Sequence, residues 1–136
     1  MYKTAFVYLG ISGFCGLFSA VYEAFSHGVY SPWMVFLFAW PLIGGALPYA
    51  LIARFAGHLD LPWARLAHHG AVACATVGAC VAGVLQIYGT SSAWVSLYWI
   101  AASVLAIPAA MVGAEHLLKR GHTVSVRAVL LGPKRD

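Results

Sequence analysis

Two long stretches of this chain carry no charged side chain. One runs from Ala24 to Ala53, and the other fills the 49 positions between Arg65 and Glu115. Only 9% of the residues are charged, whereas soluble domains carry about 25%. A helix needs about 20 mostly apolar residues to cross a hydrocarbon core roughly 30 Å thick. The sequence therefore predicts an integral membrane protein whose first partner is the lipid bilayer.

The apolar stretches predict an all-α fold of four transmembrane helices, at about 4–26, 32–56, 67–88 and 93–118. The joins between them are short, and short joins make sequential helices antiparallel neighbours. We therefore expect one four-helix transmembrane domain over 1–121, followed by a tail over 122–136.

The basic residues indicate an orientation. With four spans, all eight lysines and arginines fall on one side of the membrane: Lys3, Arg54, Arg65, Lys119, Arg120, Arg127, Lys134 and Arg135. Basic loops are retained in the cytoplasm. We expect both termini and the middle loop to be cytoplasmic, in a multi-pass protein of the cell inner membrane. The net charge of +4 then serves topology, and no nucleic-acid partner is expected.

The two outer joins resemble each other. Gly28, Ser31 and Trp33 have the same spacing as Gly89, Ser92 and Trp94, which favours a pair of duplicated hairpins related by an axis along the membrane normal. The alternative is that glycine, serine and tryptophan simply gather where helices meet the headgroups. On either interpretation, the two tryptophans are expected to anchor the outer interface.

The third predicted helix carries two adjacent stripes of small residues. One stripe comprises Gly70, Cys74, Gly78 and Ala82, and the other comprises Ala71, Ala75, Ala79 and Gly83. Small residues let helix backbones approach closely in lipid. The stripes predict either the centre of the monomer or a contact between subunits. Ala102, Ala106, Ala110 and Ala114 in helix 4 and Gly10, Gly13 and Gly16 in helix 1 add to this surface, so we expect a homo-oligomer.

The second predicted helix has two prolines and two glycines near its middle: Pro41, Gly44, Gly45 and Pro48. Proline lacks the backbone N–H that a helix needs, so a kink or a break is predicted. Broken helices expose backbone groups to substrates in many transporters. A plain kink that fits the neighbouring helices is the alternative.

Ionisable residues inside spans are costly and are treated as functional candidates. An outer cluster comprises Glu23 and His27, four residues apart, together with Gln86 and Tyr30. A carboxylate and an imidazole on one helical face are suited to binding a divalent cation or to relaying protons. The alternative is a structural Glu–His pair near water.

An inner cluster comprises His58, Asp60, His68, His69, Glu115 and His116. Helix 3 begins where helix 4 ends, so His68 or His69 is expected to approach His116, as bis-imidazole haem ligation requires. Solvated, structural histidines are the alternative. The cofactor is left undetermined, with none, haem and a divalent metal as the options.

No catalytic motif stands at a recognisable spacing, so an enzyme is not favoured. The leading hypothesis is a homo-oligomeric transporter or channel for an ion or small solute, with Glu23, His27 and the broken helix on its path. One alternative is a haem- or metal-binding redox subunit. Another is a non-catalytic accessory or assembly protein of a larger membrane complex.

Overall fold

The computed structural model describes residues 1–55 and 62–131, and for Phe55 and part of the last helix from 112 onward it describes only the backbone. Every regular element in these ranges is helical. Three helices are long and apolar enough to cross a membrane: Tyr2–Phe25, Pro62–Ile87 and Val95–Glu115, the last being part of a longer helix. The described chain is thus an all-helical protein with three candidate membrane spans.

Helix α1 (Tyr2–Phe25) uses one narrow face for packing. Its buried residues are three and four positions apart, as expected for one side of a helix: Ala5, Tyr8, Ser12, Cys15 and Ser19. Large apolar side chains cover the rest of the helix and are exposed, including Phe6, Phe14 and Leu17. Two of the inward residues are serines and one is a tyrosine, so α1 brings polar groups into the interior.

The second predicted helix is four pieces. These are α2 (Pro32–Val35), α3 (Ala39–Pro41), the π-helix η1 (Leu42–Ala46) and α4 (Leu47–Phe55). The segment predicted as one kinked or broken helix over 32–56 is thus interrupted, and none of its pieces qualifies as a span alone. Proline explains the weakness of the segment, because Pro41 and Pro48 cannot donate the amide bonds of a regular α-helix.

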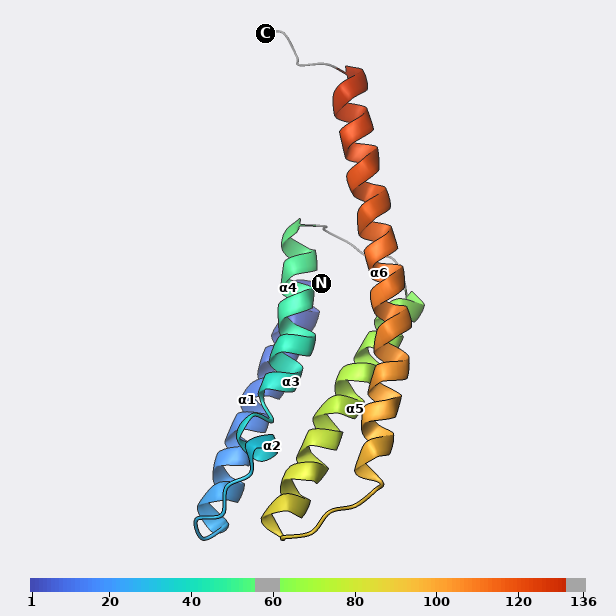
Figure 1. The fold of residues 1–136 in the computed structure, drawn as a ribbon. Helices are drawn as coiled ribbons and strands as arrows, with labels where there is room; N and C mark the ends of the chain where they lie inside the picture. Colours follow the sequence, from blue (N-terminus) through green and yellow to red (C-terminus); the bar gives the residue numbers. More distant parts are fainter. Residues whose placement is uncertain (56–61, 132–136) are drawn as a thin grey trace.

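Helix α5 (Pro62–Ile87) begins before the predicted start at 67, and α6 (Val95–Leu131) continues far beyond the predicted end at 118. The part of the expected tail over 122–131 is helical rather than a separate segment. At a rise of 1.5 Å per residue, 37 residues extend about 55 Å, which exceeds a hydrocarbon core of roughly 30 Å. Figure 1 shows α6 projecting past the other helices.

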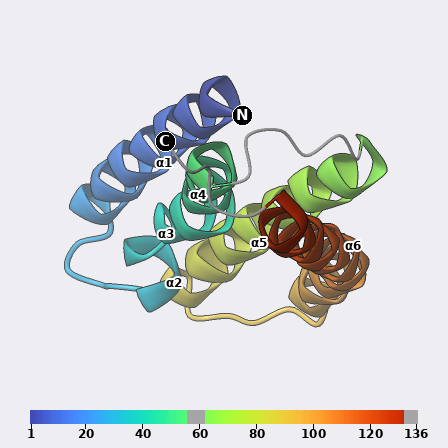
Figure 2. The same ribbon diagram turned by 90° about the horizontal axis from the view of Figure 1, so that it is seen from above.

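Helix α5 lies at the centre of the bundle (Figures 1 and 2). The α6 backbone approaches only α5 among the described elements, while α2, α3 and η1 approach α5 from another side. The two small-residue stripes serve these neighbours. A side chain at Gly70 or Gly78 would press on Leu105 or Tyr98 of α6, and one at Gly83 would press on Met34 of α2. The stripes therefore pack inside the monomer.

The two outer turns share a backbone feature but lead into different elements. Gly28 and Gly89 both have positive φ, 88° and 73°, shortly after α1 and α5 end. Glycine adopts this conformation readily because it lacks Cβ. The first turn leads into the interrupted α2–α4 segment and the second into continuous α6, so the likeness is confined to the turns.

Candidate functional site

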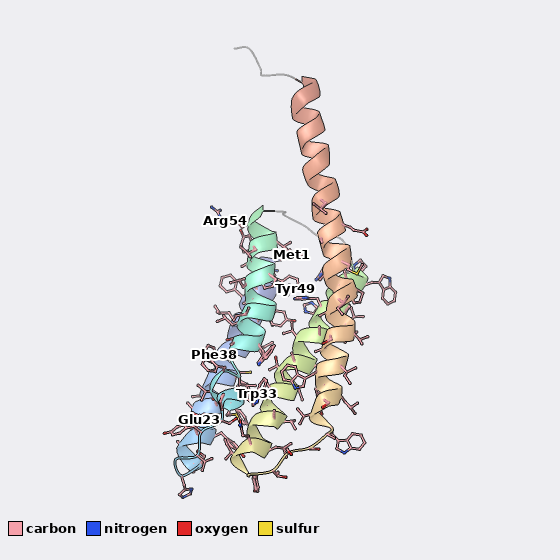
Figure 3. All side chains as sticks on the ribbon, viewed as in Figure 1. Met1, Glu23, Trp33, Phe38, Tyr49 and Arg54 are labelled. Atoms are coloured by element: carbon pink, nitrogen blue, oxygen red, sulfur yellow. The ribbon has the colours of Figure 1, made fainter. Side chains whose placement is uncertain are left out.

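The two ends of the bundle carry different polar groups. We call them the Arg65 end, where α1 and α5 begin and α4 ends, and the Glu23 end, where α1 and α5 end. Figure 3 labels Met1, Tyr49 and Arg54 toward the first and Glu23 toward the second. Residues of the predicted outer cluster lie at the Glu23 end, and His68 and His69 of the predicted inner cluster lie at the Arg65 end.

Tyr8 enters the interior between α1 and η1. Its side chain is only 8% exposed, and its ring lies against the backbone of Gly45. A Cβ atom at position 45 would overlap that ring, so glycine is required here for steric reasons. The Tyr8 ring stacks on Tyr49 of α4, with centroids 5.8 Å apart and planes within 10°. The glycine of the broken segment therefore makes room for a buried tyrosine.

His69 of α5 lies between the two tyrosine hydroxyls. Its Nδ1 atom is 2.6 Å from the Tyr8 hydroxyl, and its Nε2 atom is 3.4 Å from the Tyr49 hydroxyl. The imidazole also stacks on both rings, at centroid distances of 5.6 and 5.3 Å. A neutral imidazole donates from one nitrogen and accepts at the other, so one hydroxyl donates to His69 and the other accepts from it. The three side chains form one directional hydrogen-bonded chain.

This chain bridges helices whose backbones are not in close contact. No Cα atoms of α1 and α5 lie within 8 Å of each other among the described residues. The long Tyr8 side chain crosses this gap to reach His69. Arg65, one turn before His69 on α5, interacts with the Tyr49 hydroxyl and extends the polar chain toward the end of the bundle.

His68 connects α5 to the π-helix. Its Nε2 atom lies 2.7 Å from the Gly44 carbonyl oxygen, so Nε2 carries the proton and donates it. In a regular α-helix that carbonyl would accept from the amide of residue 48, but Pro48 has no N–H. The proline therefore removes the usual α-helical donor, and a histidine from a neighbouring helix donates instead.

Two serines of α1 form hydrogen bonds with the earlier part of the interrupted segment, around the end of α2. Ser12 Oγ donates to the Phe38 carbonyl at 2.8 Å, and Ser19 Oγ donates to the Met34 carbonyl at 2.6 Å. Both carbonyls flank the turn between α2 and α3. Irregular backbone in an apolar bundle needs such partners because no water is present to supply them. The sequence analysis missed both serines. Their spacing of three or four residues from Tyr8 and Cys15 places them on the buried face of α1, and this spacing could have identified them.

The predicted outer residues do not form one cluster. Helix α1 ends at Phe25 and His27 has a φ of 54°, so the helical spacing used to pair it with Glu23 does not reach it. His27 and Tyr30 are exposed. Gln86 Oε1 instead accepts a 2.6 Å hydrogen bond from the fully buried Ser31 hydroxyl. Glu23 Oε1 is buried without a hydrogen-bond partner among the described residues.

The histidines of the predicted inner cluster have different partners from those expected. His68 and His69 do enter a shared polar cluster, but with Tyr8, Tyr49 and the Gly44 carbonyl. Glu115 lies on α6 and makes a polar interaction there. His58, Asp60 and the side chain of His116 lie outside the described residues. Within the described part of the chain, no three histidine, cysteine or acidic side chains are grouped so as to hold a metal ion.

Of the predicted packing residues, Gly70, Gly78 and Gly83 face other helices of the same chain, as described above. Cys74 and Ala82 are partly buried on α5. By contrast, Gly10 and Gly13 of α1 would have no atom within 4 Å of an added Cβ.

Comparison with known proteins gives no relative: no family model, no curated protein and no solved structure matches this chain.

Proposed function

We propose that this protein is a small multi-pass protein of the cell inner membrane that transports an ion or small solute, and that the Tyr8–His69–Tyr49 chain passes protons on its path. The observation that supports this proposal is an imidazole held at both nitrogens by tyrosine hydroxyls inside an apolar bundle. Ionisable residues within spans mark ion and proton pathways in membrane proteins.

The chemistry of the chain suits proton transfer. Tyr8 passes its hydroxyl proton to His69 Nδ1 while it takes up a proton from water, so an imidazolium forms and the Tyr8 hydroxyl is restored. The Nε2 proton then moves to the Tyr49 oxygen while Tyr49 releases its own hydroxyl proton to water in the cavity that it lines. The ring ends as the other neutral tautomer, and reorientation of the hydroxyls and ring restores the starting state. Histidine is the side chain whose unperturbed proton affinity suits this exchange near neutral pH.

The interrupted helix belongs to the same proposal. Transporters expose backbone carbonyls at breaks in membrane helices, where protein or water satisfies them. Here His68 donates to the Gly44 carbonyl, and the adjacent position carries His69. Loss of the His68 bond would release that carbonyl toward a bound solute or cation.

Proton uptake by liposomes containing the purified protein tests the proposal. A pH-sensitive dye inside the vesicles reports uptake driven by a potassium diffusion potential. His69→Gln keeps hydrogen-bonding groups but cannot titrate, so we expect at least a tenfold loss of flux, as for removal of a general acid–base group. His27→Gln is the matched control at the other end. Equal flux in native protein and His69→Gln would contradict the proposal.

We also propose that the interrupted α2–α4 segment crosses the membrane as a fourth span, which leaves both termini cytoplasmic. The confinement of lysine and arginine to one side supports this topology. Reporter fusions test it: a fluorescent protein joined at position 131 should fluoresce, and alkaline phosphatase joined at position 90 should be active. The reverse pattern would contradict it.

A homo-oligomer remains part of the proposal, with α1 as the proposed contact. Gly10 and Gly13 are open positions in the single chain, and small residues favour close helix approach in lipid. Gly13→Leu should then reduce the mass of the detergent-solubilised complex measured by light scattering. An unchanged mass above that of the monomer would exclude this face.

The length of α6 favours a second candidate, an accessory protein of a larger membrane complex. The helix continues beyond the membrane-length part that ends at Glu115. Removal of residues 119–136 should then abolish co-purification of a stoichiometric membrane partner without changing proton flux. The haem alternative is less favoured, because both nitrogens of His69 and Nε2 of His68 already have partners. A Soret band in the purified protein would revive it.

A further inference from the structure

The Arg65 end contains a cavity that the proposed proton chain does not occupy. It has a volume of about 320 Å³ and lies between α4, α5 and α6. Tyr49, Arg65 and His68 contribute polar groups to its lining. We infer that this cavity binds the phosphate of an anionic membrane phospholipid, with the guanidinium of Arg65 as its main contact. The inference does not depend on proton transport.

The polar side of the cavity is suited to a phosphate. Arg65 is exposed and interacts with the Tyr49 hydroxyl, so a guanidinium and a phenol lie close together at the cavity. A guanidinium recognises phosphate oxygens through paired N–H donors, and these charge-assisted bonds are about twice as strong as neutral ones. Arg65 also belongs to the first turn of α5, where the helix dipole favours an anion.

The local charge favours an anion as well. Arg54 and Lys3 lie at the same end as Arg65. In the part of the chain that the structure describes, the acidic residues are Glu23, at the opposite end, and Glu115. Basic groups at the membrane surface attract anionic lipids.

The rest of the lining is suited to an acyl chain rather than to a free ion. It includes Pro48 and Ile52 of α4 and Ala109, Ala110, Gly113 and Ala114 of α6. These residues are small or aliphatic, and a Cβ at Gly113 would meet no atom within 4 Å. A charged head beside an open apolar wall matches a phospholipid, whose phosphate and hydrocarbon are joined.

Among the cavities of the described residues, the others do not combine an arginine with a histidine. A larger one, about 540 Å³, lies between α1 and α4 and includes Arg54. Its remaining residues are mostly aliphatic, and no histidine is among them. Figure 3 shows the Arg54 side chain directed away from the bundle, whereas Tyr49 lies on the side of α4 that faces α5 and α6. Arg54 is therefore a charge-matched control for Arg65.

Native mass spectrometry of the full-length protein, titrated with phosphatidylglycerol, tests the inference. We expect a 1:1 adduct whose affinity falls about tenfold in Arg65→Gln, which corresponds to about 1.4 kcal/mol. Arg54→Gln should bind as the native protein does. Gly113→Leu fills the apolar wall and should also weaken binding, while Ala24→Leu, at an exposed position outside the cavity, should not.

Three results would overturn the inference. Equal weakening by Arg65→Gln and Arg54→Gln would indicate diffuse attraction to the basic end. Native affinity in Gly113→Leu would show that the wall does not hold the ligand. Inorganic phosphate that displaces the lipid at similar concentration would indicate a free-anion site instead. Circular dichroism of each variant confirms that the helices are retained, so a loss of binding is assigned to the cavity.

Discussion

The Arg65 end and the Glu23 end of this bundle contain similar kinds of polar residue, but only the first organises them into a connected set. At the Arg65 end, Tyr8, His69 and Tyr49 form a hydrogen-bonded chain from three different helical elements. At the Glu23 end, Ser31 and Gln86 form one bond, while His27 is exposed. The difference shows that packing between helices, rather than spacing along one helix, creates the better candidate site.

The physical origin of the difference is where the helices stop. The Arg65-end residues lie within α1, α4 and α5, whose backbones fix the direction of each side chain. At the Glu23 end, α1 ends at Phe25, so His27 and Tyr30 follow a turn. A residue in a turn does not share the face of the helix before it.

The largest effect should come from Gly45→Ala, which tests whether the Arg65-end chain depends on close packing. The new Cβ overlaps the Tyr8 ring, so either the ring or η1 must shift. We expect a loss of about 2 kcal/mol in the free energy of unfolding, typical of overpacking, together with loss of proton flux. Thermal unfolding in detergent and liposome uptake measure the two effects. Gly113→Ala has open space and should lose neither, and a native-like Gly45→Ala would refute the packing argument.

Tyr8→Phe separates the hydroxyl from the ring. The stacking on Tyr49 is kept, but His69 Nδ1 loses its partner, which should cost about 1–2 kcal/mol in unfolding free energy. Flux should fall with it. Tyr30→Phe is the matched control, because Tyr30 is 69% exposed at the other end. If both variants lose the same unfolding free energy, the hydrogen bond between Tyr8 and His69 does not stabilise the fold.

Ser31→Ala tests the hydrogen bond between the Ser31 and Gln86 side chains at the Glu23 end. Ser31 is fully buried and donates to Gln86, so the variant should lose about 1 kcal/mol of unfolding free energy. Proton flux should stay at the native rate, because the proposed chain lies at the other end. A parallel loss of flux would place the Ser31–Gln86 pair on the path and remove the contrast between the two ends.

Glu23→Gln should have the smallest effect. Glu23 Oε1 is buried without a partner among the described residues, so replacing the carboxyl by an amide removes no known bond at that oxygen. We expect unfolding free energy to change by less than about 0.5 kcal/mol and flux to stay at the native rate. A complete loss of flux would restore the original hypothesis that Glu23 lies on the transport path.

Part of this structure was accessible from sequence because it depends on local composition. The apolar stretches predicted α1 and α5 to within five residues, and Pro41 and Pro48 marked the segment that is interrupted. The small residues of α5 indicated close packing, and the structure shows that it occurs inside the monomer.

The remaining features depend on contacts that spacing does not encode. Tyr8 and His69 are 61 positions apart, and only the fold brings them together. Ser12 and Ser19 are ordinary in sequence and gain their role from the carbonyls opposite them. The length of α6 was missed because Thr123–Arg127 alternates polar and apolar residues, which does not favour a helix.

The π-helix η1 has a consequence for the register of everything that follows it. A π-turn amounts to one extra residue in an α-helix, and each residue turns the helix by about 100°. Without that residue, Tyr49 would be rotated by this angle about the axis of α4, away from His69. Deleting one residue from Leu42–Ala46 should therefore disconnect the two side chains while every residue of the polar chain is retained. The number of residues in η1, an apolar segment that contains neither Tyr49 nor His69, therefore determines whether these two side chains face each other.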